Sequence, residues 1–212
     1  MTTRFKICGL RTVEAVTAAV DAGAAAIGFN CYPASARYLA PELAAAVAQR
    51  VPLWVERVAL FVNADLAQIR EGATRVGAGS VQLYGAVTPE LCAALSEWRV
   101  ILARPAVAGE TVEQLRPFAG HLAAVLLDAA VPGQHGGTGQ PADWAEARRV
   151  REAYPKWPLI LAGGLRADSV AAAIAAVRPY AVDVASGIER APGEADLQRI
   201  REFAAAVKRT DR

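Results

Sequence analysis

The chain has 212 residues, of which 54% are hydrophobic and 21% charged, and its formal net charge is +2. This length can bury one sizeable core but is short for two ordinary domains, so we expect residues 1–212 to form a single domain. The near balance of charges and the lack of a Lys/Arg-rich run argue against nucleic acid as a partner. A small-molecule ligand is the better expectation.

The cysteine count and the hydropathy pattern bear on where the protein works. Cys8, Cys31 and Cys92 are an odd number, and the N-terminal sequence lacks the charged and apolar regions of a secretory signal. No window holds eighteen or more consecutive apolar residues, so no membrane span is expected. These features predict a soluble protein of the reducing cytoplasm. They do not indicate its oligomeric state.

Short β-branched runs alternate along the chain with stretches rich in Ala, Leu and Arg. The predicted strands are 4–8, 26–29, 55–62, 80–84, 99–104, 123–128, 158–162 and 181–186. The predicted helices are 12–22, 41–50, 65–76, 89–98, 111–117, 143–153, 168–177 and 195–208. Several helices carry start signals, such as the Thr88-Pro89-Glu90 string and the Asp168-Ser169 pair.

Eight strand–helix units in 212 residues predict an α/β fold, a single compact (β/α)8 TIM barrel. Each unit has about 26 residues, which is near the lower limit, since about 250 residues are typical of the whole barrel. The fifth helix should be short or irregular because Pro117 and Gly120 interrupt it. A doubly wound sheet shares the alternation, but the count of eight and the lack of a GxGxxG string after the first strand favour the barrel.

Polar residues inside apolar strands should face the barrel interior, because alternate strand residues point inward and toward the helices. In the first strand Phe5 and Ile7 share one face, and in the fourth strand Val81 and Leu83 do, which leaves the polar residues on the other. The predicted inward polar set is Lys6, Cys8, Gln82, Tyr84, Asp128 and Asp183.

Three of these residues, Cys8, Tyr84 and Asp128, end their strands at the mouth where barrel enzymes place their chemistry. Each also has an ordinary structural explanation. A lone cysteine is more often a small buried hydrophobe, and Tyr84 could simply fill the barrel. Lys6 and Asp183, on neighbouring strands, more often form an interior ion pair than a catalytic couple.

Glycine-rich turns follow the last three strands: GGTG at 136–139, Gly163-Gly164 and Ser186-Gly187. Backbone N–H groups in such turns bind phosphate, and in barrels they do so after strands seven and eight. A single glycine pair usually marks only a tight turn, but two in consecutive places favour a phosphate site. The residues expected to form it are Gly137, Gly163, Gly164, Ser186 and Gly187.

Strings along the whole chain resemble one known family. They are KICGL at 6–10, GF at 28–29, YPASARY at 32–38, FVN at 61–63, VQLYG at 81–85, LD at 127–128, GGTG at 136–139, DW at 143–144, LAGGL at 161–165 and VDVASGIE at 182–189. This pattern resembles the phosphoribosylanthranilate isomerases of tryptophan biosynthesis.

The resemblance implies an Amadori rearrangement of N-(5-phosphoribosyl)anthranilate to 1-(2-carboxyphenylamino)-1-deoxyribulose 5-phosphate, with a phosphosugar substrate and no cofactor or metal. It implies that Cys8 is the base for the carbon 2 proton and Asp128 the acid for the ring oxygen. Arg37 would face the anthranilate carboxylate, which its planar fork suits. Tyr84 and Asp183 would also contact the substrate.

The two implied catalytic groups must work against their ordinary ionisation, because a free cysteine titrates near ~8.5 and a free aspartate near ~3.9. We expect positive charge from Lys6 or Arg37 to lower the pKa of Cys8. We expect desolvation by the aromatic substrate to raise the pKa of Asp128.

The chain departs from the family pattern in several places. Tyr84 stands where the family commonly has histidine, so the electrostatic support that a histidine would give is in doubt. The loop 33–38, the Asn30-Cys31 pair and Ala185 also differ from the usual strings. These changes bear on substrate scope and rate and leave Cys8 and Asp128 in place.

Other functions on the same barrel fit less well. A metal-dependent epimerase needs His and Asp ligands at the mouth, yet His121 and His135 are the only histidines and neither ends a strand. A Schiff-base aldolase or an indole-glycerol-phosphate synthase needs a lysine at a strand end, and only Lys6 lies on a strand. The histidine-pathway isomerases have an aspartate in place of Cys8. A non-catalytic phosphate-binding barrel stays open.

Overall fold

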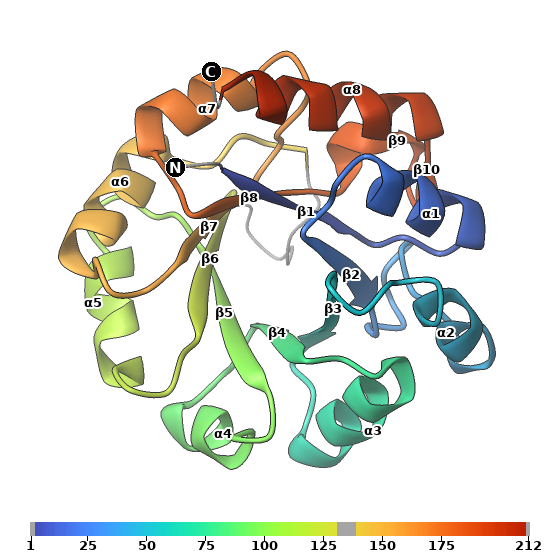
Figure 1. Ribbon diagram of the computed structural model, residues 1–212. Coiled ribbons are helices and arrows are strands. Elements are labelled where there is room, and N and C mark those ends of the chain that lie inside the picture. Colours follow the sequence, from blue (N-terminus) through green and yellow to red (C-terminus); the bar gives the residue numbers. More distant parts are fainter. Residues whose placement is uncertain (1–2, 131–138, 211–212) are drawn as a thin grey trace.

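The computed structural model describes residues 3–130 and 139–210, and its strands form one closed parallel barrel surrounded by helices (Figure 1). Each strand pairs with the next, and the last pairs with the first. The strands are β1 (Arg4–Cys8), β2 (Ala26–Asn30), β3 (Glu56–Val62), β4 (Ser80–Tyr84), β5 (Arg99–Pro105), β6 (Ala124–Asp128), β7 (Leu159–Leu161) and β8 (Ala181–Val184). The predicted (β/α)8 barrel is confirmed, and the doubly wound sheet is excluded.

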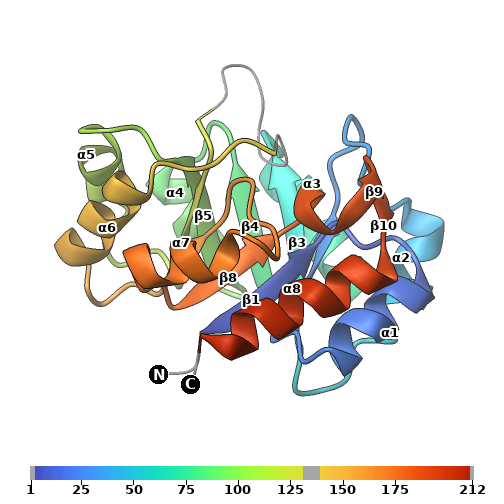
Figure 2. The same ribbon diagram turned by 90° about the horizontal axis from the view of Figure 1, so that it is seen from above.

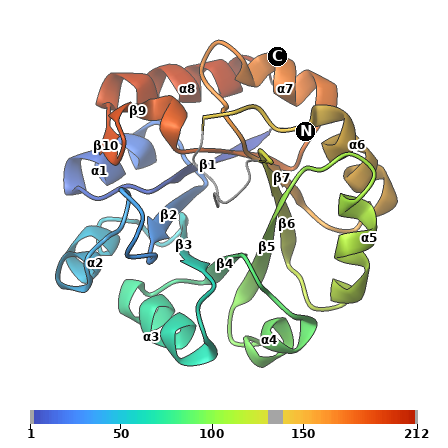
Figure 3. The same cartoon turned by 180° about the vertical axis from the view of Figure 1, so that it is seen from behind.

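One helix follows each of these strands on the outside of the barrel, as the view from behind also shows (Figure 3). The α-helices are α1 (Val13–Asp21), α2 (Pro41–Ala48), α3 (Leu66–Val76), α4 (Pro89–Ala94), α5 (Thr111–Leu115), α6 (Trp144–Ala153), α7 (Val170–Val177) and α8 (Leu197–Arg209). The fifth is short, as predicted, and continues into the 3-10 helix η1 (Arg116–Phe118), which contains Pro117.

The helix starts follow local chemistry. The Thr88 hydroxyl accepts a hydrogen bond from the Leu91 N–H at 3.2 Å, and Pro89 takes the first helical position, where a missing N–H costs nothing. Asp65 and Gln68 form a reciprocal capping box at the start of α3. The predicted start signal at Thr88-Pro89-Glu90 is confirmed, and the capping box of α3 is a local signal that the prediction had not used.

Most boundaries differ from the prediction by only one or two residues, and the ends of α4, β7 and β8 show what determines such differences. Helix α4 ends at Ala94 and not at 98, because Leu95 leaves the helical conformation with φ −101° and ψ 28°. Strand β7 ends at Leu161, before the positive-φ turn at Gly163. After β8, Ser186, which was predicted as the last strand residue, begins the 3-10 helix η2 (Ser186–Ile188). This helix leads into an unpredicted hairpin of β9 (Glu189–Ala191) and β10 (Glu194–Ala195).

The buried apolar residues form two layers. Phe5, Ile7, Val81 and Leu83 belong to the larger cluster between the strands and the helices, as the alternation predicted. A smaller cluster fills the barrel interior and includes Cys8, Val58, Leu60, Val62, Tyr84, Ile101, Ala103, Ala124, Leu126, Ile160, Ala162 and Ala181. The interior is therefore mixed: β3, β5 and β7 contribute apolar side chains to it, and the predicted polar set comes from β1, β4, β6 and β8.

Different segments of the chain lie at the two ends of the barrel (Figure 2). The carboxyl ends of the strands, the β2–α2 loop and the β9–β10 hairpin lie at one end, which we call the mouth. The beginning of β1 and the end of α8 lie at the opposite end. Candidate catalytic residues at strand ends are thereby separated from the chain termini.

Candidate active site

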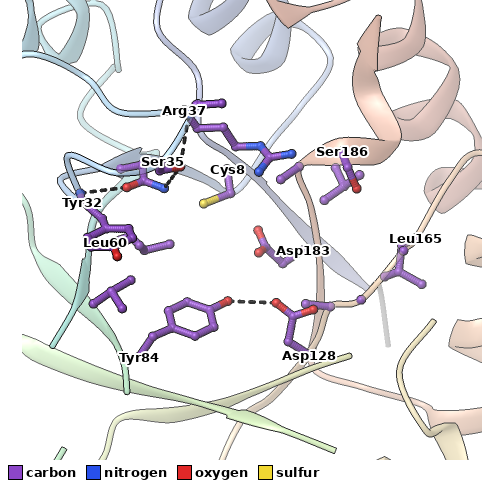
Figure 4. A pocket seen from close by; sticks show the side chains of 18 of the residues that line it. Cys8, Tyr32, Ser35, Arg37, Leu60, Tyr84, Asp128, Leu165, Asp183 and Ser186 are labelled. Carbon is purple, nitrogen blue, oxygen red and sulfur yellow. Dashed lines mark hydrogen bonds between the residues drawn. The ribbon is translucent and has the colours of Figure 1, made fainter. Parts of the chain in front are cut away.

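A cavity of about 350 Å³ opens at the mouth, and eight of the ten residues predicted for the site line it (Figure 4). They are Cys8, Arg37, Tyr84, Asp128, Gly163, Gly164, Asp183 and Ser186. Gly187 is not among the lining residues, and Gly137 lies outside the described part of the chain. The cavity joins residues from seven strands or the loops that follow them.

Cys8 is the last residue of β1, and its side chain is buried beside β2. The register pairs Cys8 with Gly28, where a Cβ would lie 2.6 Å from the Cys8 sulfur and 3.1 Å from the Lys6 Cε. Both contacts are closer than side-chain packing allows. Gly28 thus provides the space that the thiol and the lysine stem occupy.

The environment of the Cys8 thiol differs from the sequence prediction. Burial raises its pKa, the Lys6 charge acts in the opposite direction, and the charge of Asp183 adds to the rise. Lys6 is itself held by Asp183, with Nζ donating to Oδ1 at 2.8 Å. The predicted lowering of the Cys8 pKa is therefore wrong, because desolvation exceeds the attraction of a lysine that already has a carboxylate partner.

Asp128 ends β6 and receives two hydrogen bonds. The Ala129 N–H donates to Oδ1 at 2.7 Å, and the Tyr84 hydroxyl donates to Oδ2 at 3.1 Å (Figure 4). Burial nevertheless raises the pKa of Asp128, with both hydrogen bonds acting against the rise. We expected a bound substrate to raise the pKa of Asp128, and burial within the protein already raises it. The Gln82 side-chain amide donates to the Tyr84 hydroxyl at 3.3 Å and completes a chain across the barrel.

Arg37 lies in the loop between β2 and α2, and its guanidinium is bound by a residue that the sequence had not indicated. Its Nε donates to Glu189 Oε1 at 2.7 Å, and its Nη2 donates to Glu189 Oε2 at 2.8 Å. The Ser35 hydroxyl accepts from the Arg37 backbone N–H at 3.1 Å. Gly9, with φ +81°, lets the stem pass, since a Cβ there would lie 2.6 Å from the Arg37 Cδ.

No local spacing could have linked Glu189 to Arg37, because 152 residues separate them in the chain. Glu189 stood in the sequence only as the last residue of the VDVASGIE string. Asn30 is another lining residue that the prediction missed. Its amide donates to Ser35 Oγ at 3.1 Å and so supports the Arg37 loop from β2.

The glycine turns after β7 and β8 lie against each other. Gly163 and Gly164 have φ of +86° and +58°, values that side-chain-bearing residues rarely adopt. A Cβ on Gly187 would lie 1.9 Å from the Leu165 carbonyl oxygen, so only glycine permits this contact. A Cβ on Gly139 would lie 3.8 Å from Ser186 Oγ, which brings the end of the GGTG segment to the same place.

Two further features concern metals and membranes. Within residues 3–130 and 139–210, no three His, Cys, Asp or Glu side chains are grouped closely enough to hold a metal ion. In the same ranges no helix has both the length and the apolar character needed to cross a membrane. His121 is exposed in the turn before β6, and His135 lies outside the described residues.

A closed (β/α)8 barrel with a thiol, a carboxyl group and an arginine around one cavity at its mouth defines a barrel enzyme for a small polar substrate. Comparison with known proteins identifies the family. The family model for N-(5'phosphoribosyl)anthranilate (PRA) isomerase matches residues 5–206. The chain therefore belongs to the N-(5'-phosphoribosyl)anthranilate isomerase family.

Individual relatives agree over nearly the full chain. The isomerase of Pelobacter propionicus is 42% identical over 207 residues, covering 98% of this chain and 96% of that protein. A crystal structure of the Thermotoga maritima isomerase has a TM-score of 0.87 and 37% identity, covering 97% and 98% of the two chains. Another isomerase structure, with a TM-score of 0.85, 34% identity and the same coverage, is a complex with reduced 1-(o-carboxyphenylamino)-1-deoxyribulose 5-phosphate.

Proposed function

We propose that the chain isomerises N-(5'-phosphoribosyl)anthranilate to 1-(2-carboxyphenylamino)-1-deoxyribulose 5-phosphate, with Cys8 as general base and Asp128 as general acid. The observation that carries this assignment is that both residues end inward-facing strands and line the same cavity. A thiol and a carboxyl group can each transfer a proton to or from carbon or oxygen when held within hydrogen-bond reach.

The proposed reaction is an isomerisation, so it adds no atoms and every proton that is taken up is also given back. Asp128 gives a proton to the ring oxygen as the bond from that oxygen to carbon 1 breaks, and the nitrogen lone pair forms a C=N bond. The Cys8 thiolate then takes the proton from carbon 2, and the electrons of that C–H bond form a C=C bond while the C=N electrons return to nitrogen. The resulting enol becomes the ketone when carbon 1 gains a proton and the carbon 2 hydroxyl loses one. Return of a proton from the Cys8 thiol to the Asp128 carboxylate, through the solvent, restores both groups.

The pKa shift of Asp128 supports its role as the acid, whereas the pKa shift of Cys8 limits its role as the base. Burial raises the pKa of Asp128, which favours the protonated form that an acid needs. Burial also raises the pKa of Cys8, so only a fraction of the protein carries the thiolate at neutral pH. The charge of Lys6 beside the thiol increases that fraction.

Arg37, Tyr84 and Asp183 are proposed to contact the substrate, since all three line the cavity. Arg37 would hold the anthranilate carboxylate by charge-assisted hydrogen bonds.

The phosphate is proposed to bind at the adjoining glycine turns, through Gly163, Gly164, Ser186 and Gly187, with Gly137 outside the described residues. The ligand in the related isomerase complex carries both a carboxylate and a phosphate group.

The remaining expectations complete the proposal. The isomerisation as written uses neither a metal nor a cofactor. We also propose that the enzyme works in the cytoplasm, which its three free cysteines support, and that residues 1–212 form one domain, since a single barrel accounts for the described chain.

The test uses the fluorescence change of the anthranilate group during turnover by purified Cys8→Ala and Asp128→Asn proteins. Each substitution should lower kcat/KM by roughly 100- to 10,000-fold, the usual contribution of a general acid or base. Cys31→Ala and Asp21→Asn are matched controls, because Cys31 does not line this cavity and Asp21 is exposed at the end of α1. Activity within tenfold of the parent in either variant would remove that residue from the proposal. Ligand binding without turnover by the parent protein would instead favour a non-catalytic phosphate-binding barrel.

A further inference from the structure

Glu189 lies at the start of the β9–β10 hairpin, beside the loop that carries Arg37. We infer that Glu189 is a positioning residue that holds the Arg37 guanidinium in one orientation at the mouth and thereby determines recognition of an aromatic carboxylate. This inference rests on the proposal that Arg37 binds the carboxylate of the anthranilate ring.

The contact between the two side chains is two-pronged and shielded. Two guanidinium nitrogens donate to two carboxylate oxygens at 2.7 and 2.8 Å, a planar arrangement that fixes direction as well as distance. The exposed fractions of the side chains are 13% for Arg37 and 6% for Glu189. Such a pair is far less mobile than an exposed ion pair between two long side chains.

Glu189 is itself anchored by neighbours that do not contact the cavity. The Gly193 N–H, across the hairpin, donates to Glu189 Oε1 at 3.2 Å. The Arg199 guanidinium on α8 donates to the Glu189 backbone oxygen. The Asp196 N–H donates to the Ile188 oxygen at 2.8 Å, which ties the start of α8 to the residue before Glu189. The carboxylate therefore belongs to a framework formed by the hairpin and α8.

Arg37 is constrained from its own side as well. Ser35 accepts from its backbone N–H, and the stem crosses Gly9 in space that a Cβ would fill. Gly193 packs against the same loop, because a Cβ there would lie 2.2 Å from the Ala36 oxygen. The backbone, stem and head group of Arg37 are thus each held by a different part of the mouth.

This geometry has a consequence for binding. A guanidinium has two edges that can bind a carboxylate in a two-pronged way, and Glu189 takes the edge formed by Nε and Nη2. A ligand carboxylate would therefore meet a guanidinium whose orientation Glu189 imposes. Glu189 also neutralises much of the arginine charge, so two possible roles predict opposite effects of its removal. Loss of positioning weakens carboxylate binding, whereas loss of neutralisation strengthens it.

The experiment measures Kd for two ligands: reduced 1-(2-carboxyphenylamino)-1-deoxyribulose 5-phosphate and the same compound without the carboxylate. Glu189→Gln should raise Kd for the carboxylated ligand at least tenfold and that for the other ligand less than twofold. KM should rise in parallel, with kcat within threefold of the parent. Glu194→Gln is the matched control, because it removes a carboxylate from an exposed ion pair on the same hairpin.

A second variant, Glu189→Asp, keeps the charge but is one methylene shorter and cannot reach both nitrogens in the same position. Positioning predicts weaker binding of the carboxylated ligand here too. Thermal unfolding of each variant identifies any that fails to fold. Tighter or unchanged binding of the carboxylated ligand in Glu189→Gln would overturn the inference, as would an equal loss for both ligands.

Failure of the underlying proposal has a separate signature. Arg37→Ala should lose most of the preference for the carboxylated ligand. If it keeps the parent's preference, Arg37 does not bind the carboxylate, whatever the Glu189 variants do.

Discussion

The Tyr84 hydroxyl and the Asp128 carboxyl group form a contact that the family's usual histidine would make differently. Tyrosine is neutral near pH 7, and burial raises the pKa of Tyr84 well above its ordinary value, so its hydroxyl keeps its proton. The hydroxyl donates to Asp128 and favours the ionised carboxylate. Tyr84 therefore opposes the protonated state that the acid needs, while it holds the carboxyl group in one orientation.

Tyr84→Phe should move the acidic limb of the kcat/KM profile to higher pH. Removing the donor destabilises the carboxylate, so the already raised pKa of Asp128 rises further. The charges of Lys6 and Asp183 also act on Asp128, and those of Asp183 and Cys8 act on Tyr84; the substitution leaves these three residues in place. The acidic limb reports Asp128 because a carboxyl group titrates below a thiol, and burial raises the pKa of the Cys8 thiol further from its ordinary value.

The profile is measured from kcat/KM across the pH range in which the protein stays folded, as checked by circular dichroism. Tyr154→Phe is the control, since that hydroxyl donates to the Val112 oxygen away from the mouth. An acidic limb that stays in place or moves to lower pH would contradict the assigned effect of Tyr84.

At the scale of elements, the sequence predicted best where local chemistry alone decides the structure. The capping residue Thr88 and the following Pro89 placed the start of α4, whereas the end of α4 and the length of β7 depend on how those segments pack. Ser169, which was read as a start signal, makes no cap on α7, because its hydroxyl bonds to the Arg166 backbone in the preceding turn. The β9–β10 hairpin has two short strands and little periodicity, so no pattern revealed it.

Asp65→Ala should lower the free energy of unfolding by about 1 kcal/mol, the usual contribution of a capping carboxylate. The substitution removes the acceptor for the Gln68 N–H, which bonds to Asp65 Oδ1 at 2.9 Å, and breaks the reciprocal bond of the capping box. Urea unfolding measures the change. Asp168→Ala removes an equally exposed acid near a helix start but no cap, so its effect should be within about 0.5 kcal/mol of zero. Equal losses in the two variants would show that charge, and not capping, is responsible.

At the scale of the whole molecule, the barrel closes where the first and last strands meet. Lys6 of β1 pairs in register with Asp183 of β8, and their side chains form a buried ion pair at 2.8 Å. The sequence predicted this pair, because strand alternation turned both residues inward. Breaking one side of a buried pair leaves an uncompensated charge, which costs much more than an exposed pair contributes.

Lys6→Met should therefore lower the free energy of unfolding by about 3 to 5 kcal/mol. The double variant Lys6→Met/Asp183→Leu should recover a large part of this loss, since no unpaired charge remains in the interior. Both values come from urea unfolding at one pH. A loss below about 1 kcal/mol for the single variant, the range of exposed pairs, would mean that water or another cation compensates Asp183.

The fold was predictable from the sequence because eight similar units repeat one local pattern. Strand alternation placed Cys8 and Asp128 at the mouth, and the resemblance to a known family implied their catalytic roles. Contacts between distant loops were not predictable in this way. The pairing of Arg37 with Glu189 depends on how the β2–α2 loop meets the β9–β10 hairpin. The raised pKa of Cys8 depends on burial and on the prior engagement of Lys6, which composition and spacing do not reveal.

The joining of β1 to β8 also determines when the protein can first work during its synthesis. Cys8 and Lys6 leave the ribosome long before Asp183 and Glu189, which emerge only when α8 is about to follow. Until then a nascent chain has an unpaired lysine in an open sheet and an arginine without its carboxylate. The barrel interior and the mouth are both incomplete until β8 has been synthesised. A chain that terminates before Asp183 should therefore be inactive and degraded by proteases.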